Sequence, residues 1–197
     1  MDLLEQYRRS VAEFTARVRQ IRPDQWSDPT PCTGWDVRAL VNHIVYEQRW
    51  IPPLLAGATV AEVGDRYDGD MLGADPQAGA VAAAGAADAA IAGPGALDRT
   101  VHLSFGDTPA AEYVRQLLAD HLVHAWDLAA AIGADRRLPP ESVVQCAAWF
   151  AGQEDGYRRA GAIGPRVEVP PDADEQDRLI AAFGRDPAWS GNGRTAP

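Results

Sequence analysis

The longest helical pattern in the sequence runs from Thr108 to Ile132, and it limits the possible folds more than any other segment. Thr108 is a typical capping residue, Pro109 suits a first helical turn, and Gly133 is a typical stop. Between these signals, apolar residues recur at helical spacing. A helix with this much apolar surface must pack against others, so partner helices are expected elsewhere in the chain.

The same periodicity recurs in other segments, which are separated by stretches rich in proline and glycine. Helices are predicted over residues 2–20, 35–50, 75–92, 108–132, 140–160 and 174–183. A flexible linker is the alternative for residues 75–92, which are rich in alanine and glycine. Residues 99–105 alternate in polarity, which favours a short strand or extended segment. We therefore predict an all-α four-helix bundle with a short extended or β segment and extra C-terminal helices.

Local signals set the expected ends of the second helix. Thr33 and Asp36 have the spacing of a capping box, with Thr33 as the cap. The helix is then expected to run over residues 35–50. Pro52 and Pro53 should end or kink it, because proline cannot donate a backbone hydrogen bond.

Composition and charge exclude several classes of partner. With a formal net charge of −10 and an isoelectric point of about 4.7, the chain lacks the basic surface that binds nucleic acids or anionic membranes. The apolar runs are too short to span a bilayer and the N-terminal residues mix charges, so a cytoplasmic location is expected. Cys32 and Cys146 are too few for a disulfide scaffold. Small-molecule partners are expected, with the chain acting as a monomer or homodimer.

Four polar residues lie on strongly apolar helical segments. Asp120 and His124 are one helical turn apart, so their carboxylate and imidazole can converge on one small cation. His121 is a neighbour of His124 on the same helix. On the helix at residues 35–50, His43 lies among apolar side chains, where an imidazole needs a hydrogen-bond partner or a metal. Antiparallel packing would bring the two helices' polar groups together. The alternative is that all four are ordinary polar residues on helices.

Further side chains are secondary candidates. Glu47 lies one turn after the histidine of the second helix and is a candidate metal ligand or general base. Arg49 and Trp50 are candidates for cofactor binding, with surface exposure and core packing as their respective alternatives. Asp127 is expected either to orient a ligand imidazole or to bind an arginine or a helix end. Cys32 has no histidine near it in sequence that could activate it as a nucleophile.

Three motifs in combination resemble a known family. The stretches PTPCTGWDVRALVNHIVYEQ, HLVHAWDLAAAIG and DRLIAAFGRDPAW resemble the mycothiol-dependent maleylpyruvate isomerase-like family, within the DinB-like metal-binding bundles. The resemblance implies a single DinB-like metal-binding domain over residues 1–197. It also implies a divalent metal, usually zinc, with His43, Asp120 and His124 as ligands. The isomerase is expected to carry glutamate at the position of Asp120, so His121 becomes an alternative ligand.

The resemblance also implies an activity. A divalent ion such as Zn²⁺, Ni²⁺ or Fe²⁺ with three protein ligands keeps one position open, which is typical of catalytic sites. Two neutral imidazoles and one carboxylate leave about one positive charge, which a thiolate neutralises. We expect a mycothiol-dependent transferase or isomerase in which a metal-bound thiolate attacks a small electrophile, with no catalytic side chain identified. The alternatives are a metal-dependent hydrolase, which uses metal-bound water, and a non-catalytic metal-binding module.

Overall fold

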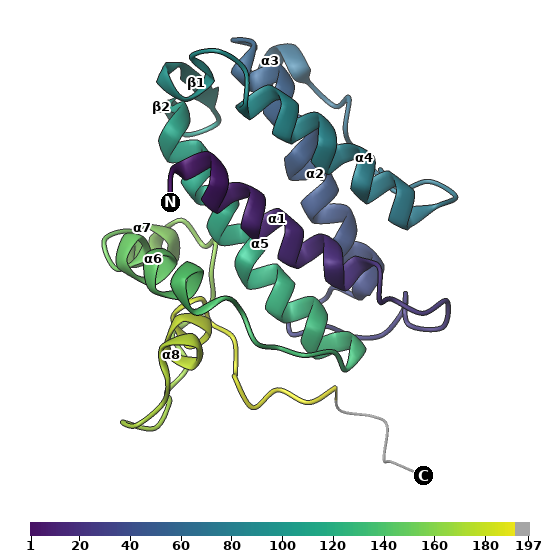
Figure 1. The fold of residues 1–197 in the computed structure, drawn as a ribbon, viewed down its shortest axis with the longest axis vertical. Coiled ribbons are helices and arrows are strands. Elements are labelled where there is room, and N and C mark those ends of the chain that lie inside the picture. Colours follow the sequence, from purple (N-terminus) through teal and green to yellow (C-terminus); the bar gives the residue numbers. More distant parts are fainter. Residues whose placement is uncertain (192–197) are drawn as a thin grey trace.

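Four long helices form the body of the molecule in the computed structural model, which describes residues 1–191 (Figure 1). They are α1 (Leu3–Val18), α2 (Val37–Leu55), α4 (Pro76–Ile91) and α5 (Ala110–Ile132). α1 packs along α5 and α2 packs along α4, while α2 also contacts α5 and α1 contacts α4. The predicted all-α four-helix bundle is confirmed, and residues 75–92 form a helix rather than a linker.

Shorter elements connect and extend the bundle. They are α3 (Val60–Val63), the 3₁₀ helix η1 (Ala96–Asp98), β1 (Thr100–Leu103), β2 (Gly106–Pro109), α6 (Pro140–Phe150), α7 (Glu154–Arg159) and α8 (Glu175–Ala182). β1 and β2 form an antiparallel hairpin in which Val101 lies opposite Thr108. The predicted extended segment is therefore one strand of a two-stranded sheet. Within residues 1–191, no helix is long and apolar enough to cross a membrane.

A side-chain cap fixes the start of α2. Asp36, rather than the predicted Thr33, is the N-cap, because its carboxylate accepts a hydrogen bond from the Ala39 amide at 2.8 Å. Asp36 also pairs with Pro29 through an isolated β-bridge, which ties the proline-rich loop to the helix start. This arrangement places His43 in the second turn of the helix.

The two prolines that were expected to end or kink α2 lie inside it. Pro52 and Pro53 have no amide hydrogen, yet the helix continues to Leu55 because later amides supply the bonds of the last turn. The Ala56 N–H donates to the Pro52 carbonyl at 3.0 Å, and the Ala58 N–H donates to the Pro53 carbonyl at 3.0 Å. The predicted end of the helix near residue 50 is therefore about one turn too early.

Two other predicted boundaries differ from the structure. Thr108 does not cap α5, because its backbone is paired in β2, and the N-cap is Pro109 without a side-chain hydrogen bond. At its other end α5 stops at Gly133 as predicted, with a φ of 71° that favours glycine. The helix predicted over residues 140–160 is divided into α6 and α7 by a turn at residues 151–153.

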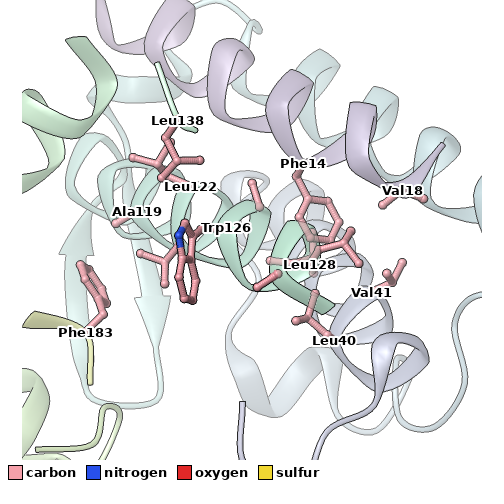
Figure 2. Packing of buried hydrophobic residues seen from close by; sticks show 14 of the residues in the cluster. Phe14, Val18, Leu40, Val41, Ala119, Leu122, Trp126, Leu128, Leu138 and Phe183 are labelled. Atoms are coloured by element: carbon pink, nitrogen blue, oxygen red, sulfur yellow. The ribbon is translucent and has the colours of Figure 1, made fainter. Parts of the chain in front are cut away.

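One apolar cluster extends from the bundle into the C-terminal segment (Figure 2). Its buried side chains include Phe14, Val18, Leu40, Val41, Leu122, Trp126, Leu128, Leu138 and Phe183. Phe183 follows α8 and stacks on Phe150 of α6, with ring centroids 3.8 Å apart. Since burial of apolar surface drives folding, this stack holds the chain that leads to Arg185 against the rest of the protein.

Truncation of the Phe150 ring is expected to weaken that junction. Phe150→Ala removes a side chain that is 1% exposed, so the free energy of unfolding should fall by about 3–5 kcal/mol. Chemical denaturation of both proteins measures the change. Val144→Ala, on the exposed side of the same helix, is the matched control and should change stability by no more than about 0.5 kcal/mol. An equally small change for Phe150→Ala would contradict this role of the stack.

Candidate metal centre

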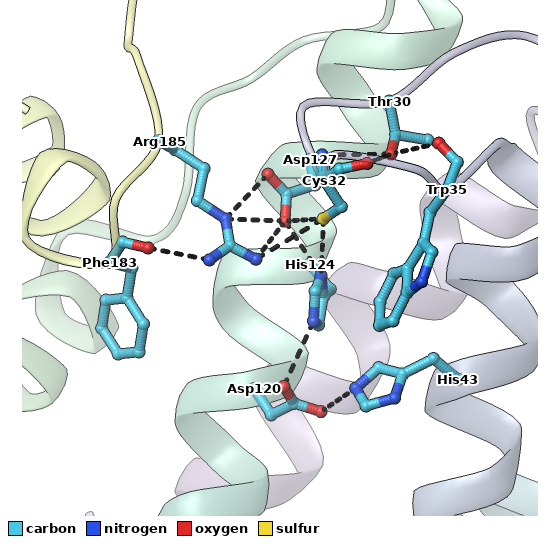
Figure 3. A network of polar contacts seen from close by, with 9 residues as sticks. All are labelled: Thr30, Cys32, Trp35, His43, Asp120, His124, Asp127, Phe183 and Arg185. Atoms are coloured by element: carbon cyan, nitrogen blue, oxygen red, sulfur yellow. Dashed lines mark hydrogen bonds and ion pairs between the residues drawn. The ribbon is translucent and has the colours of Figure 1, made fainter. Parts of the chain in front are cut away.

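Three polar side chains from α2 and α5 meet in the wall of a cavity, and Figure 3 shows them together. Asp120 lies between the two histidines: its Oδ2 is 3.2 Å from His43 Nε2 and its Oδ1 is 3.2 Å from His124 Nε2. One potential ligand atom from each residue lies within 4.8 Å of the other two. The structure thus brings His43 together with Asp120, which lies 77 residues away in the sequence, and with His124 one turn further along α5.

Trp35 holds the two imidazoles in place from the loop before α2. Its ring centroid is 4.8 Å from that of His43 and 5.9 Å from that of His124. The two imidazoles lie edge to face, with centroids 5.1 Å apart. Because the Asp36 cap fixes the loop to the helix start, the indole cannot move far without disturbing α2. The aromatic ring therefore limits the orientations that both histidines can adopt (Figure 3).

The charges around Asp120 and His124 shift the pKa of both groups. Burial raises the pKa of Asp120, but the neighbouring His43 and His124 outweigh burial and leave it well below its usual value. Burial lowers the pKa of His124, yet the Asp120 charge and hydrogen bonds to its neighbours raise it well above its usual value. Without a metal, His124 therefore carries a proton at neutral pH that a cation must displace.

Asp127 binds the other nitrogen of the His124 ring. Asp127 Oδ2 lies 2.9 Å from His124 Nδ1, and the aspartate side chain is fully buried. Arg185 neutralises this carboxylate, since its Nη2 donates to the same oxygen at 3.2 Å. Burial raises the pKa of Asp127, but Arg185 and the bond to His124 lower it overall. Asp127 therefore accepts the Nδ1–H proton and turns Nε2 towards Asp120.

Cys32 completes this network from the proline-rich loop. Its Sγ donates to Asp127 Oδ2 at 3.1 Å and lies 3.7 Å from His124 Nδ1. The Arg185 Nη2 is 3.5 Å from the sulfur (Figure 3). Sequence reasoning missed both contacts, because neither loop residue belongs to a helical pattern and the cysteine lies 92 positions from its histidine. Their only sequence signal is the resemblance of their motifs to the family.

Cys32, His124 and Asp127 form a second group with atoms close enough for metal binding. The Arg185 guanidinium, which contacts both the cysteine and the aspartate, would repel a cation placed there. The positive charge of Arg185 already neutralises the Asp127 carboxylate. The group around Asp120 is therefore the better candidate for a metal site, and the second group lies beside it.

His121 does not face the candidate metal centre. Its side chain is fully buried, with Nδ1 2.6 Å from the Leu117 carbonyl and Nε2 2.8 Å from Gln48 Nε2. Its ring packs edge to face against Tyr7 and Phe14 of α1. One residue along a helix turns the side chain by about 100°, which here directs His121 into the bundle interior. The prediction that it could replace Asp120 as a ligand is therefore wrong.

Arg49 and Trp50 do not line the cavity. Six residues after His43, Arg49 is rotated by about 240° around α2. Trp50 is 8% exposed and packs against Tyr46 and Tyr67, with ring centroids 5.9 Å away in each case. Core packing, the alternative for Trp50, is confirmed. Neither Arg49 nor Trp50 is placed to contact a cofactor bound in this cavity.

The cavity beside the candidate metal centre has a volume of about 710 Å³. Its polar lining includes Cys32, His43, Glu47, Tyr113, Gln116, Asp120, His124, Tyr157 and Arg185. Asp120 keeps 29% of its side chain exposed, so the candidate centre is open to this space. Burial, assisted by the charge of Asp120, raises the pKa of Glu47 to about 7 against the opposing effect of the two histidines. A small molecule in the cavity would contact both the centre and Glu47.

Residues 7–129 match the family model described as the mycothiol maleylpyruvate isomerase N-terminal domain. The match covers well over half of the chain and includes Cys32, His43, Asp120 and His124. The chain belongs to this family. Arg185, which supports Asp127, lies beyond the matched region of this maleylpyruvate isomerase-like protein.

Relatives of this family member agree with that placement. Two uncharacterized proteins of Mycobacterium tuberculosis, from strains CDC 1551 / Oshkosh and H37Rv, are each 34% identical over 203 residues, covering 94% of this chain and 98% of the relative. A crystal structure of the mycothiol-dependent maleylpyruvate isomerase is 16% identical with a TM-score of 0.58, covering 78% of this chain and 73% of that one. A mutant of that isomerase is 17% identical with a TM-score of 0.59, covering 75% and 68%. The two structures show that the DinB-like fold is shared.

Proposed function

We propose that this protein is an enzyme that depends on a divalent metal, with zinc as the first candidate, and on mycothiol. Its substrate would be a small electrophile, and the reaction would be thiol transfer or isomerisation by addition and elimination. The observation that carries the proposal is the convergence of His43, Asp120 and His124 beside an open cavity. Family membership supplies the thiol, since the family is named for a mycothiol-dependent isomerase.

The donor set fits a divalent ion. Zinc binds imidazole nitrogen and carboxylate oxygen at about 2.0–2.2 Å, so neighbouring ligands of a tetrahedral site lie roughly 3.3 Å apart. Asp120 Oδ2 lies 3.2 Å from His43 Nε2, and Asp120 Oδ1 lies 3.2 Å from His124 Nε2. One ligand atom from each of the three residues lies within 4.8 Å of the other two, so the three side chains are close enough to share one ion. Two neutral imidazoles and one carboxylate leave about one positive charge, and three ligands leave one position for a small molecule. A bound cation would stabilise the thiolate form of mycothiol at neutral pH.

The rest of the site keeps these donors in position. Asp127 retains the proton on His124 Nδ1, which leaves Nε2 free to bind. Arg185 keeps the charge of Asp127 neutralised and fixes the carboxylate. Trp35 shields the His43 ring on the loop side. The chain thus presents a pre-oriented ligand set on two rigid helices, which lowers the reorganisation needed on binding.

Thiol-dependent turnover tests this function. Zinc-loaded protein with mycothiol is expected to consume small α,β-unsaturated carbonyl compounds, and removal of the metal by a chelator should lower the rate by at least about 100-fold. Loss of free thiol and change in substrate absorbance are followed together, because transfer consumes thiol and isomerisation does not. Hydrolysis of esters without thiol would instead indicate a hydrolase, and absence of metal binding would indicate a non-catalytic module.

A further inference from the structure

The cavity continues past the metal centre to a second polar region. Along α5, Tyr113 lies two turns before Asp120, whereas Asp127 lies two turns after it, so each is about 10 Å away along the helix axis. On the facing helix, Glu47 lies one turn beyond His43 in the direction of Tyr113. Tyr113 and Glu47 both line the cavity. They lie at the end of the cavity away from Asp127 and its partners Cys32 and Arg185.

A second polar group, the Tyr113 hydroxyl, is buried in the wall at this end of the cavity. The residue is only 5% exposed, yet its oxygen has no hydrogen-bond partner among the described residues. A buried hydroxyl without a partner is costly, so buried hydroxyls normally bind protein groups, water or ligands. Burial, with a contribution from Glu47, raises the pKa of Tyr113 well above its usual value. The hydroxyl therefore keeps its proton and can both donate and accept a hydrogen bond.

The charges around the cavity oppose a carboxylate in this region. The Glu47 carboxyl group faces the cavity, and above its pKa of about 7 its negative charge repels a second anion. The Arg185 guanidinium also lines the cavity, but it is bound to Asp127 Oδ2 at 3.2 Å and to the Phe183 carbonyl at 2.8 Å. Its positive charge is therefore already neutralised. A hydroxyl or amino group suits this end better, since it donates to Glu47 and bonds the Tyr113 oxygen.

We propose that Glu47 and Tyr113 form a specificity subsite that binds a hydroxyl or amino group and disfavours a carboxylate. The inference rests on the proposed function, because it assumes that the thiol sulfur binds at the candidate metal centre. The recognised group belongs either to the thiol or to the electrophile. In both cases the preferred substrates are neutral or cationic at that position.

Binding of matched thiols tests whether the recognised group belongs to the thiol. Zinc-loaded protein is titrated by calorimetry with 1-propanethiol, 3-mercapto-1-propanol, 3-amino-1-propanethiol and 3-mercaptopropionate. The hydroxyl and amino thiols should bind about tenfold more tightly than the carboxylate. Glu47→Gln should remove most of the discrimination against the carboxylate, and Tyr113→Phe should weaken the hydroxyl thiol. Tyr46→Phe, outside the cavity on α2, is the control and should change none of the affinities.

Matched electrophiles test whether the recognised group belongs to the electrophile. With 1-propanethiol as the thiol, KM is compared for N-(2-hydroxyethyl)acrylamide and N-acryloylglycine. A preference for the hydroxyl compound that Glu47→Gln removes would assign the recognised group to the electrophile. Absence of a Glu47-dependent preference in both experiments, while propanethiol still binds, would overturn the subsite alone. Failure of all four thiols to bind would overturn the proposed function together with it.

Discussion

Replacement of His124 by alanine is expected to remove divalent metal from the protein. His124 contributes one of three donor atoms and contacts Asp120 at 3.2 Å. Loss of a residue that only orients a ligand typically lowers metal affinity by 10–100-fold, so loss of the ligand itself should lower it by at least about 100-fold. Metal content should fall from about one ion per chain to near zero after gel filtration. Elemental analysis and competition with a chromophoric chelator measure content and affinity.

A second histidine provides the matched control for this experiment. His102 lies in the β1–β2 hairpin, is 39% exposed and pairs with Asp107 at 2.7 Å. His102→Ala removes the same side chain and should leave metal content unchanged. Thermal unfolding of both variants shows whether they remain folded. Equal metal content in wild type and His124→Ala would remove this residue from the ligand set.

Metal affinity is expected to rise with pH across the neutral range. Burial alone lowers the pKa of His124, but Asp120 and the hydrogen bonds around the ring raise it well above 6.5. Below that raised pKa the metal-free protein holds a proton on His124, which the cation must displace. Affinity should therefore fall by about tenfold per pH unit as the pH decreases, and it should level off above the raised pKa.

Calorimetry in buffers with different ionisation enthalpies measures this exchange. At neutral pH, binding of zinc to the apo-protein should release about one proton. The stability of the apo-protein should change in the opposite sense, because the bonds of protonated His124 stabilise it fully below its unfolded pKa. That contribution is lost as pH rises through the folded pKa. Metal affinity that is constant between pH 6 and 8 would contradict the protonation of His124 in the metal-free state.

Helical periodicity carried most of the fold prediction. The segment ending at Gly133 is a helix because its apolar spacing and its terminating glycine agree. The meeting of His43 with Asp120 was expected from two antiparallel helices, each with polar groups on an apolar face. The orientation of His121 could not be predicted, because it and Asp120 differ by only one position. Only the packing of α1 against α5 decides which of the two faces the cavity.

The side-chain contacts that could not be predicted from the sequence come mainly from residues in loops. Arg185 and Cys32 lie 153 positions apart on segments without periodicity, so no spacing rule brings them together. Their approach depends on tertiary contacts, such as the stacking of Phe183 on Phe150. The Asp127 side chain shows the same limit. Two interpretations were open for it: it could orient an imidazole, or it could bind an arginine or a helix end. The structure shows the imidazole and the arginine contacts at once.

The most direct test of the metal centre is a crystal structure of zinc-loaded protein with anomalous data collected at the zinc edge. One anomalous peak should lie about 2.0–2.2 Å from His43 Nε2, His124 Nε2 and an oxygen of Asp120. A zinc ion bound instead by Cys32 and Asp127, or the absence of a peak between α2 and α5, would contradict the account.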